Sequence, residues 1–148
     1  MKKSFFKILR GNDTGATGSH QAGVAIPKSN RELLDFFPFL NPKEDNPDAW
    51  ITCIDPNQEK WEMRYIYYNG KLTGKSTRDE YRLTHTTKFL SLWGAKTGDK
   101  MVFESTSQCG VYLISIQDQK ETDSSEEKRG ATTSRPPVIK LKGWHRAY

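Results

Sequence analysis

Charged and hydroxyl side chains are concentrated in residues 69–82, whose sequence is Asn-Gly-Lys-Leu-Thr-Gly-Lys-Ser-Thr-Arg-Asp-Glu-Tyr-Arg. Arginine can donate two hydrogen bonds to the O6 and N7 atoms of guanine, and a carboxylate can accept one from the N4 amino group of cytosine. Lysine and hydroxyl groups suit phosphate oxygens, which position a protein on DNA without reading its sequence. The candidates here are Lys71, Lys75, Ser76, Thr77, Arg78, Asp79, Glu80, Tyr81 and Arg82. The alternative is a solvated charged hairpin, whose internal ion pairs contribute little stability.

A second unusual segment, residues 11–23, contains four glycines and few side chains that could build a core. Glycines at this density let a backbone approach a partner closely. The polar candidates in it are Asn12, Asp13, Thr14, Thr17, His20 and Gln21, and Lys28 follows nearby. Such loops favour recognition, although a flexible hairpin connection remains the alternative. The two segments together indicate a binding surface.

Three catalytic patterns are present only in incomplete form. Residues 70–76 resemble a phosphate-binding loop but are one residue short of its spacing, and no apolar helix follows. Asp123, Glu126 and Lys128 offer a nuclease-like set in a segment that we expect to lack rigid structure. The three histidines are scattered, which disfavours a zinc site. We expect no catalytic residue, no metal and no cofactor for binding.

The composition favours one globular domain with a polyanionic partner. The chain has 148 residues, a net charge of +5 and a pI near 9.2. Its mean hydropathy is low, at −0.79, but 17 aromatic residues can supply a buried core. No membrane-length apolar run and no signal peptide stand out. We therefore expect a single domain over residues 1–148 in the cytoplasm, with Cys53 and Cys109 as reduced, half-buried thiols.

Short runs rich in β-branched and aromatic residues predict a mainly β fold with short α-helices. Strands are expected over 4–10, 50–55, 61–68, 100–106, 111–117 and 138–141, with a hairpin turn at 107–110. Helices are expected over 30–37, capped by Ser29, and from Thr86 or Thr87 to Gly94. Residues 118–137 are polar and favour a disordered or long surface loop. Trp50, Trp61 and Trp93 are expected in the core, and Trp144 is expected to pack the C-terminal segment onto the body.

Both polar segments resemble the DNA-contacting arms of the N-terminal effector domain of EcoRII-like restriction endonucleases. The first match is residues 12–23 with Ile26-Pro-Lys28, and the second is residues 67–82. The pattern of Phe89, Leu92, Gly98-Asp99 and Phe103 is similar to the helix-loop-strand signature of the plant B-three-type DNA-binding fold, and Trp144-His145 is similar to the closing segment of the effector domain.

The resemblance implies a seven-stranded DNA-binding pseudobarrel whose two arms grip the major groove of double-stranded DNA. The family reads CCWGG, where W is A or T. By resemblance, residues 12–21 form one arm and residues 75–82 the other, with Arg78, Glu80 and Arg82 at base-reading positions. Tyr81 stands where the relative has a basic residue, so we expect a different phosphate or base contact at this position.

In the family this domain precedes a separate nuclease domain, and only that domain would need Mg²⁺. The expected function is therefore non-catalytic targeting within a restriction-modification system. The alternatives are a stand-alone transcription-factor-like or modified-base-sensing DNA-binding protein, or a small metal-dependent nuclease.

Overall fold

Alternating side chains define the strands that carry the core. In β6 (Lys100–Ser105) Met101 and Phe103 are fully buried, and in β7 (Val111–Gln117) Tyr112 and Ile114 are buried. Side chains two residues apart lie on the same face of a strand, so each strand gives one face to the interior. The two strands form the expected hairpin around residues 107–110.

The computed structural model describes residues 3–14, 23–118 and 143–146. The remaining elements in chain order are β1 (Ser4–Ile8), α1 (Gly11–Thr14), β2 (Val24–Ile26), α2 (Arg31–Phe36), β3 (Asp48–Ile54), β4 (Lys60–Tyr68), α3 (Gly70–Thr73), β5 (Glu80–Thr84), α4 (Thr87–Leu92) and β8 (Gly143–Arg146). The expected loop over 118–137 and the expected strand over 138–141 lie almost entirely outside the described residues, of which Asp118 is the last before the gap.

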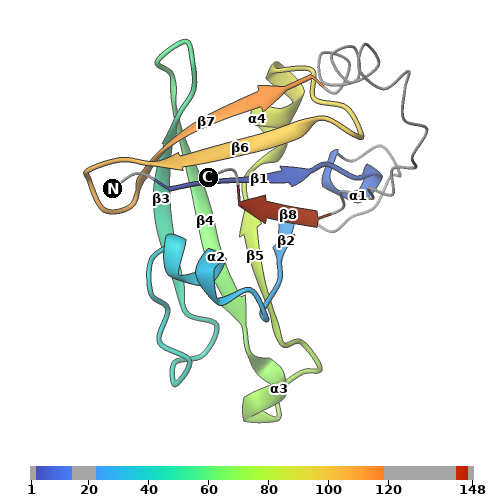
Figure 1. Cartoon of the computed structure of the whole chain (residues 1–148). Helices are drawn as coiled ribbons and strands as arrows, with labels where there is room; N and C mark the ends of the chain where they lie inside the picture. The colour runs from blue at the N-terminus through green and yellow to red at the C-terminus, as the bar shows by residue number, and fades with distance from the viewer. Residues whose placement is uncertain (1–2, 15–22, 119–142, 147–148) are drawn as a thin grey trace, which may run out of the picture.

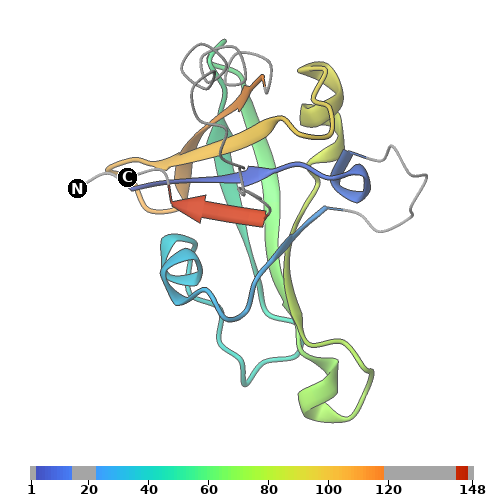
Figure 2. The ribbon, with the colours of Figure 1, turned by 45° about the vertical axis from the view of Figure 1, so that its right-hand side comes forward.

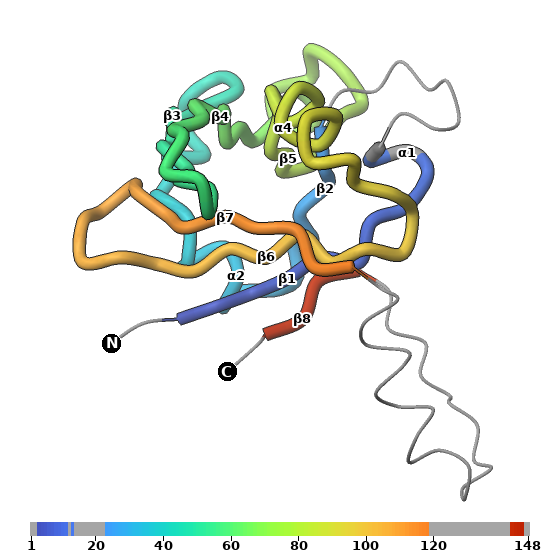
Figure 3. Tube along the Cα trace, turned by 90° about the horizontal axis from the view of Figure 1, so that it is seen from above, coloured from blue at the N-terminus to red at the C-terminus, as the bar shows by residue number. Residues whose placement is uncertain are grey.

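The strands form one sheet in the order β2-β5-β4-β3-β7-β6-β1-β8. All neighbours are antiparallel except β3 and β7, which pair in parallel. Figure 1 shows β3, β4 and β5 running upright while β7, β6, β1 and β8 cross them, and Figure 3 shows the same two groups from above. The sheet therefore turns sharply where β3 meets β7.

This turn brings the two edge strands, β2 and β8, towards each other. The indole Nε1 of Trp144 on β8 donates a hydrogen bond to the carbonyl oxygen of Ala25 on β2, at 2.9 Å. The sheet is thus nearly closed into a barrel by a side chain, without a backbone ladder between its edges. The mainly β pseudobarrel is confirmed, with eight strands among the described residues where seven were expected. The expected packing of Trp144 onto the body is also confirmed.

An aromatic cluster fills the barrel, with Phe37 at its centre. The ring of Phe37 lies 4.9 Å from Tyr65, 5.5 Å from Tyr112 and 6.3 Å from Trp144, measured between centroids. Large aromatic side chains bury much area each, so few residues suffice for a core in a chain of low mean hydropathy. None of the helices in the described ranges has the length and apolar character needed to cross a bilayer.

A buried carboxylate ties α4 to the β3–β4 hairpin. Asp55 is 2% exposed, and its Oδ2 accepts from the indole Nε1 atoms of Trp61 and Trp93 at 3.0 and 3.2 Å. Its Oδ1 accepts from the backbone amides of Asn57 and Glu59. Burial acts to raise the pKa of the Asp55 carboxyl, but these four hydrogen bonds outweigh it and hold that pKa below its ordinary value.

Several sequence expectations need correction. Trp50 is not in the core: it is 53% exposed, packs on the ring of His85 and lies opposite Arg64 of β4. Cys53 is fully buried and Cys109 is exposed, so neither is half-buried, although both are free. The cap of α2 is Asn30, whose Oδ1 accepts from the amide of Leu33, and not Ser29. Amide and hydroxyl oxygens cap helices equally well, so sequence alone did not separate the two.

Replacing Asp55 with asparagine should lower the midpoint of thermal unfolding by several degrees, because an amide NH₂ would face the donors that the carboxylate accepts from. Since the pKa is depressed in the folded state, the stabilisation is fully present above the unfolded value of about 3.9 and is lost as pH falls through the folded value.

The difference in melting midpoint between wild type and Asp55→Asn should therefore be constant above about pH 5 and shrink below about pH 4. Circular dichroism melts across this range provide the measurement. A difference that widens as the pH falls would contradict the assignment.

Candidate nucleic-acid interface

Two polar segments each lead into one of two paired strands. The first arm, residues 11–23, runs from α1 into β2, and the second arm, residues 69–82, runs through α3 into β5. Figure 2 shows α1 and α3 at two ends of one side of the molecule, with β2 and β5 between them. The last three residues of the second arm, expected to be loop, belong to β5.

The pairing of β2 with β5 sets how the arms sit relative to each other. Val24, Ala25 and Ile26 pair with Leu83, Arg82 and Tyr81. Gly23, the last residue of the first arm, has φ +86°, and a Cβ there would lie 2.3 Å from the carbonyl oxygen of Leu83. Only glycine accepts this φ and this close approach without strain. The first arm therefore ends at a defined point against β5.

Internal hydrogen bonds close the second arm into a compact loop. The amides of Lys75 and Ser76 both donate to the carbonyl oxygen of Gly70, at 2.9 and 3.2 Å, and the amide of Lys71 donates to that of Arg78, at 2.8 Å. A Cβ on Gly70 would lie 2.0 Å from Oγ of Ser76, so the loop can close only on glycine there. The resemblance of residues 70–76 to a phosphate-binding loop does not extend to the structure, since α3 has only four residues.

Several charged side chains of the second arm are paired within the protein. Nη2 of Arg78 lies 2.7 Å from Oε2 of Glu80, and the guanidinium of Arg78 lies 3.7 Å from the ring centroid of Tyr68. Nζ of Lys75 lies 2.6 Å from Oδ2 of Asp45, and both side chains are more than half exposed. Exposed pairs of this kind exchange readily with other partners, since each is worth little.

Arg82 differs from Arg78 in being buried. Its side chain is 8% exposed, and Nη2 donates to the carbonyl oxygen of Gly23 at 3.0 Å while Nη1 lies 3.5 Å from Oε1 of Glu80. Arg82 thus joins the end of the first arm to the second. Glu80 in turn links Arg82 to Arg78, so the three expected base-reading residues form one connected group.

A second group joins Lys28 to Asp79. Nζ of Lys28 lies 2.9 Å from both carboxylate oxygens of Asp79, and the hydroxyl of Tyr67 donates to Oδ1 of Asp79 at 2.6 Å. The hydrogen bonds donated by Tyr67 and Lys28 hold the pKa of Asp79 below its ordinary value, and the bond that Lys28 donates to Asp79 raises the pKa of Lys28. The rings of Tyr67 and Tyr81 stack at 4.2 Å.

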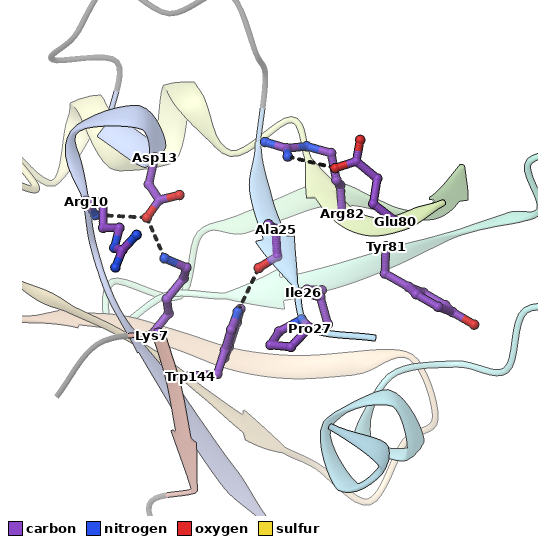
Figure 4. A pocket seen from close by; sticks show the side chains of 11 residues that line it. Lys7, Arg10, Asp13, Ala25, Ile26, Pro27, Glu80, Tyr81, Arg82 and Trp144 are labelled. Carbon is purple, nitrogen blue, oxygen red and sulfur yellow. Dashed lines mark hydrogen bonds and ion pairs between the residues drawn. The ribbon is translucent and has the colours of Figure 1, made fainter. Parts of the chain in front are cut away.

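The base of the first arm is held by a buried ion pair. Nζ of Lys7 lies 2.7 Å from Oδ2 of Asp13, with both side chains less than a tenth exposed, and Oδ2 also accepts from the amide of Arg10. These residues line a pocket of about 390 Å³ that opens at the seam between β2 and β8. Figure 4 shows Lys7 and Asp13 on one side of this pocket, with Glu80 and Arg82 on the other side of β2.

For several of the remaining candidate residues, the structure describes only the backbone or nothing at all. Thr17, His20 and Gln21 lie outside the described residues, and for Asn12 and Thr14 only the backbone, in α1, is described. Lys71, Ser76 and Thr77 are exposed on the second arm. Among the described side chains, no three histidine, cysteine or carboxylate groups gather as a metal site. The DNA contacts expected of these residues stay predictions.

Sequence reasoning missed the tyrosines that hold the second arm. Tyr67 and Tyr68 end β4 and contact Asp79 and Arg78 respectively. Adjacent strand residues point to opposite faces, so two consecutive tyrosines at a strand end can support both faces of the loop that follows. That spacing was visible in the sequence, but the partners became apparent only from the pairing of β4 with β5.

Replacing Asp13 with alanine should destabilise the fold by about 3 kcal/mol, because it leaves the ammonium of Lys7 buried without its carboxylate. Replacing Asp48, whose pair with Arg64 is about one-third exposed, should cost less than about 1 kcal/mol. Urea unfolding of the two variants makes the comparison. Equal losses would show that the buried pair does not hold the first arm.

Comparison with known proteins finds a matching family model and a curated relative. Residues 2–131 match the family model described as restriction endonuclease EcoRII, N-terminal. The type II restriction enzyme EcoRII of Escherichia coli is 34% identical over 149 residues, which cover 89% of this chain and 36% of that enzyme. The chain therefore spans about a third of the length of this relative.

Two solved structures share the fold. The first is an Arabidopsis FUS3–DNA complex, with a TM-score of 0.57 and 21% identity over 76% of this chain and 94% of that one. The N-terminal domain of Helicobacter pylori LlaJI.R1 also has a TM-score of 0.57, with 14% identity over 100% of this chain and 98% of that one. At such identities the likeness concerns the fold alone. The resemblance drawn from the two arms is confirmed by the family match.

Proposed function

Because the chain belongs to the family of N-terminal domains of EcoRII restriction endonucleases, we propose that it binds double-stranded DNA sequence-specifically through its two arms. It would serve as the effector or targeting domain of a type II restriction endonuclease in the bacterial cytoplasm. The observation that carries this proposal is the connected group of Arg78, Glu80 and Arg82, held where the two arms meet.

The chemistry of this group suits G·C pairs. Arg78 offers a guanidinium that can bind O6 and N7 of guanine, and Glu80 offers a carboxylate that can accept from N4 of cytosine. Both are partly exposed, so both can reach a base edge once a duplex lies between the arms. A CCWGG-like site in the major groove, as the family resemblance implies, matches this chemistry.

Arg82 would act mainly by holding the two arms in position. Its contact with Gly23 is buried, so Arg82 can hold the end of the first arm beside Glu80. The net charge of +5 supports attraction to the phosphate backbone. Binding itself would need no cofactor, and Mg²⁺ would be needed only by a separate, fused nuclease domain. We propose no catalysis for this chain itself.

Replacing Arg78 with alanine should weaken binding to the preferred duplex by about 1–3 kcal/mol and reduce its preference over a scrambled duplex, because one guanine contact is lost. Titration of labelled duplexes at fixed salt measures both affinities. The matched control is Arg146→Ala, since Arg146 is also about half exposed and paired with one carboxylate, Glu32, on β8 and α2. An unchanged preference in Arg78→Ala would overturn this role for the second arm.

Replacing Lys75 with alanine should instead weaken all duplexes alike, because a lysine on a phosphate carries no sequence information. The plot of log affinity against log salt should become shallower by about 0.9, the value for one phosphate contact. Titrations at four salt concentrations provide the slope. A selective loss on the preferred duplex with an unchanged slope would show that Lys75 reads a base.

A further inference from the structure

Three side chains from separate parts of the chain meet beside the second arm. Lys28 follows β2, Tyr67 lies near the end of β4, and Asp79 precedes β5. Lys28 and Asp79 are 51 residues apart in sequence, yet two Nζ–carboxylate distances of 2.9 Å join them. Lys28 and Asp79 lie beyond the backbone ladder of β2 and β5, and Tyr67 lies within that of β4 and β5, so the three residues link three parts of the chain.

Both oxygens of the Asp79 carboxylate take part in this link. Its Oδ1 accepts from the hydroxyl of Tyr67 and from Lys28, and its Oδ2 accepts from Lys28. A carboxylate that reads cytosine must offer a free lone pair in the right direction. Asp79 could offer only its second Oδ2 position, beside the bound ammonium of Lys28, because Oδ1 already accepts from Lys28 and from a phenol that is 2% exposed.

The link extends the β2–β5 ladder at the end that faces the second arm. The last ladder pair is Ile26 with Tyr81, and Lys28 and Asp79 each lie two residues beyond it. At the other end, Arg82 donates to the carbonyl oxygen of Gly23. The short ladder is thus held at both ends by side chains, one for each arm.

The position of Asp79 affects its two neighbours. Successive side chains of an extended segment point to opposite sides. With Asp79 held towards Lys28 and Tyr67, Arg78 and Glu80 are turned to the other side, where they pair with each other and where Arg78 packs on Tyr68. The ring of Tyr67 is itself fixed by stacking on Tyr81 at an angle of 4°.

We propose that Lys28, Tyr67 and Asp79 form a brace that positions Arg78 and Glu80 for base recognition, and that Lys28 and Asp79 are positioning residues and do not contact DNA. This inference rests on the proposed function for its role in recognition, while the brace itself can be tested in the free protein. Tyr67 is too buried to contact DNA directly, so in this proposal it affects specificity only through Asp79.

The first experiment uses the free protein. Tyr67→Phe keeps the stacked ring and removes only the hydroxyl, so the chain should fold. Hydrogen exchange at the amide of Lys71, which donates to the carbonyl oxygen of Arg78, should become about tenfold faster, the effect expected for one lost hydrogen bond to a charged group. Exchange in the β6–β7 hairpin should not change. Unchanged exchange at Lys71 would overturn the brace.

The second experiment measures DNA binding. Tyr67→Phe and Lys28→Met should each lower the ratio of preferred to scrambled affinity by about tenfold, and the double variant should lose little more, because both changes break one unit. The salt slope should stay at the wild-type value, since no phosphate contact is removed. If Lys28→Met weakens both duplexes equally and lowers the slope by about 0.9, Lys28 binds a phosphate and the proposal is wrong.

Tyr112→Phe is the matched control. The hydroxyl of Tyr112 is also buried, and it donates to the carbonyl oxygen of Phe36 at 2.7 Å, between β7 and α2, which belong to neither arm. Its removal should lower stability without changing the specificity ratio. A wild-type chain that shows no preference for any duplex would refute the proposed function, and the exchange measurement would still decide whether the brace exists.

Discussion

The three-residue pairing between β2 and β5 is the constraint on which the candidate interface depends. Each strand continues one arm, so the ladder converts two segments far apart in sequence into one surface. Backbone pairing fixes the register, and side chains secure both ends, Arg82 on Gly23 and Lys28 on Asp79. The rest of the barrel supports this pair of strands: β4 supplies the tyrosines that contact the second arm, and β8 reaches β2 through Trp144.

The free protein holds its recognition side chains by pairing them with its own carboxylates. Arg78 and Lys75 each contact an acidic partner, so their positions are restricted before DNA arrives. Restriction of this kind lowers the ordering cost of binding. The pairs differ in exposure: that of Lys75 is open to solvent, whereas Asp79 is also bound to a buried phenol. A duplex can therefore replace some of these partners easily and leave others intact, which separates contact residues from positioning residues.

Much of the fold was predictable from local sequence. The aromatic and β-branched runs located β3, β4, β6 and β7 to within two residues, because their alternation is strong. The three residues of β2 have no such signal, and β5 begins with Glu80 in a charged segment, so its start was assigned to the loop. Trp50 was misplaced for a related reason: its neighbour across the sheet, and not its own hydrophobicity, decides its exposure. For the site, residue types indicated both arms, but the pairing of Lys28 with Asp79 and the contribution of Tyr67 depend on long-range register that no local pattern reveals.

The most direct measurement of the central claim is selection of bound duplexes from a random pool by the purified chain, followed by sequencing. Two arms that insert arginine and glutamate side chains against base edges predict enrichment of one short, G·C-containing site, with CCWGG as the expected form. Retention of duplexes without any enriched sequence would show that the arms contact only the phosphate backbone, and would contradict base recognition by this surface.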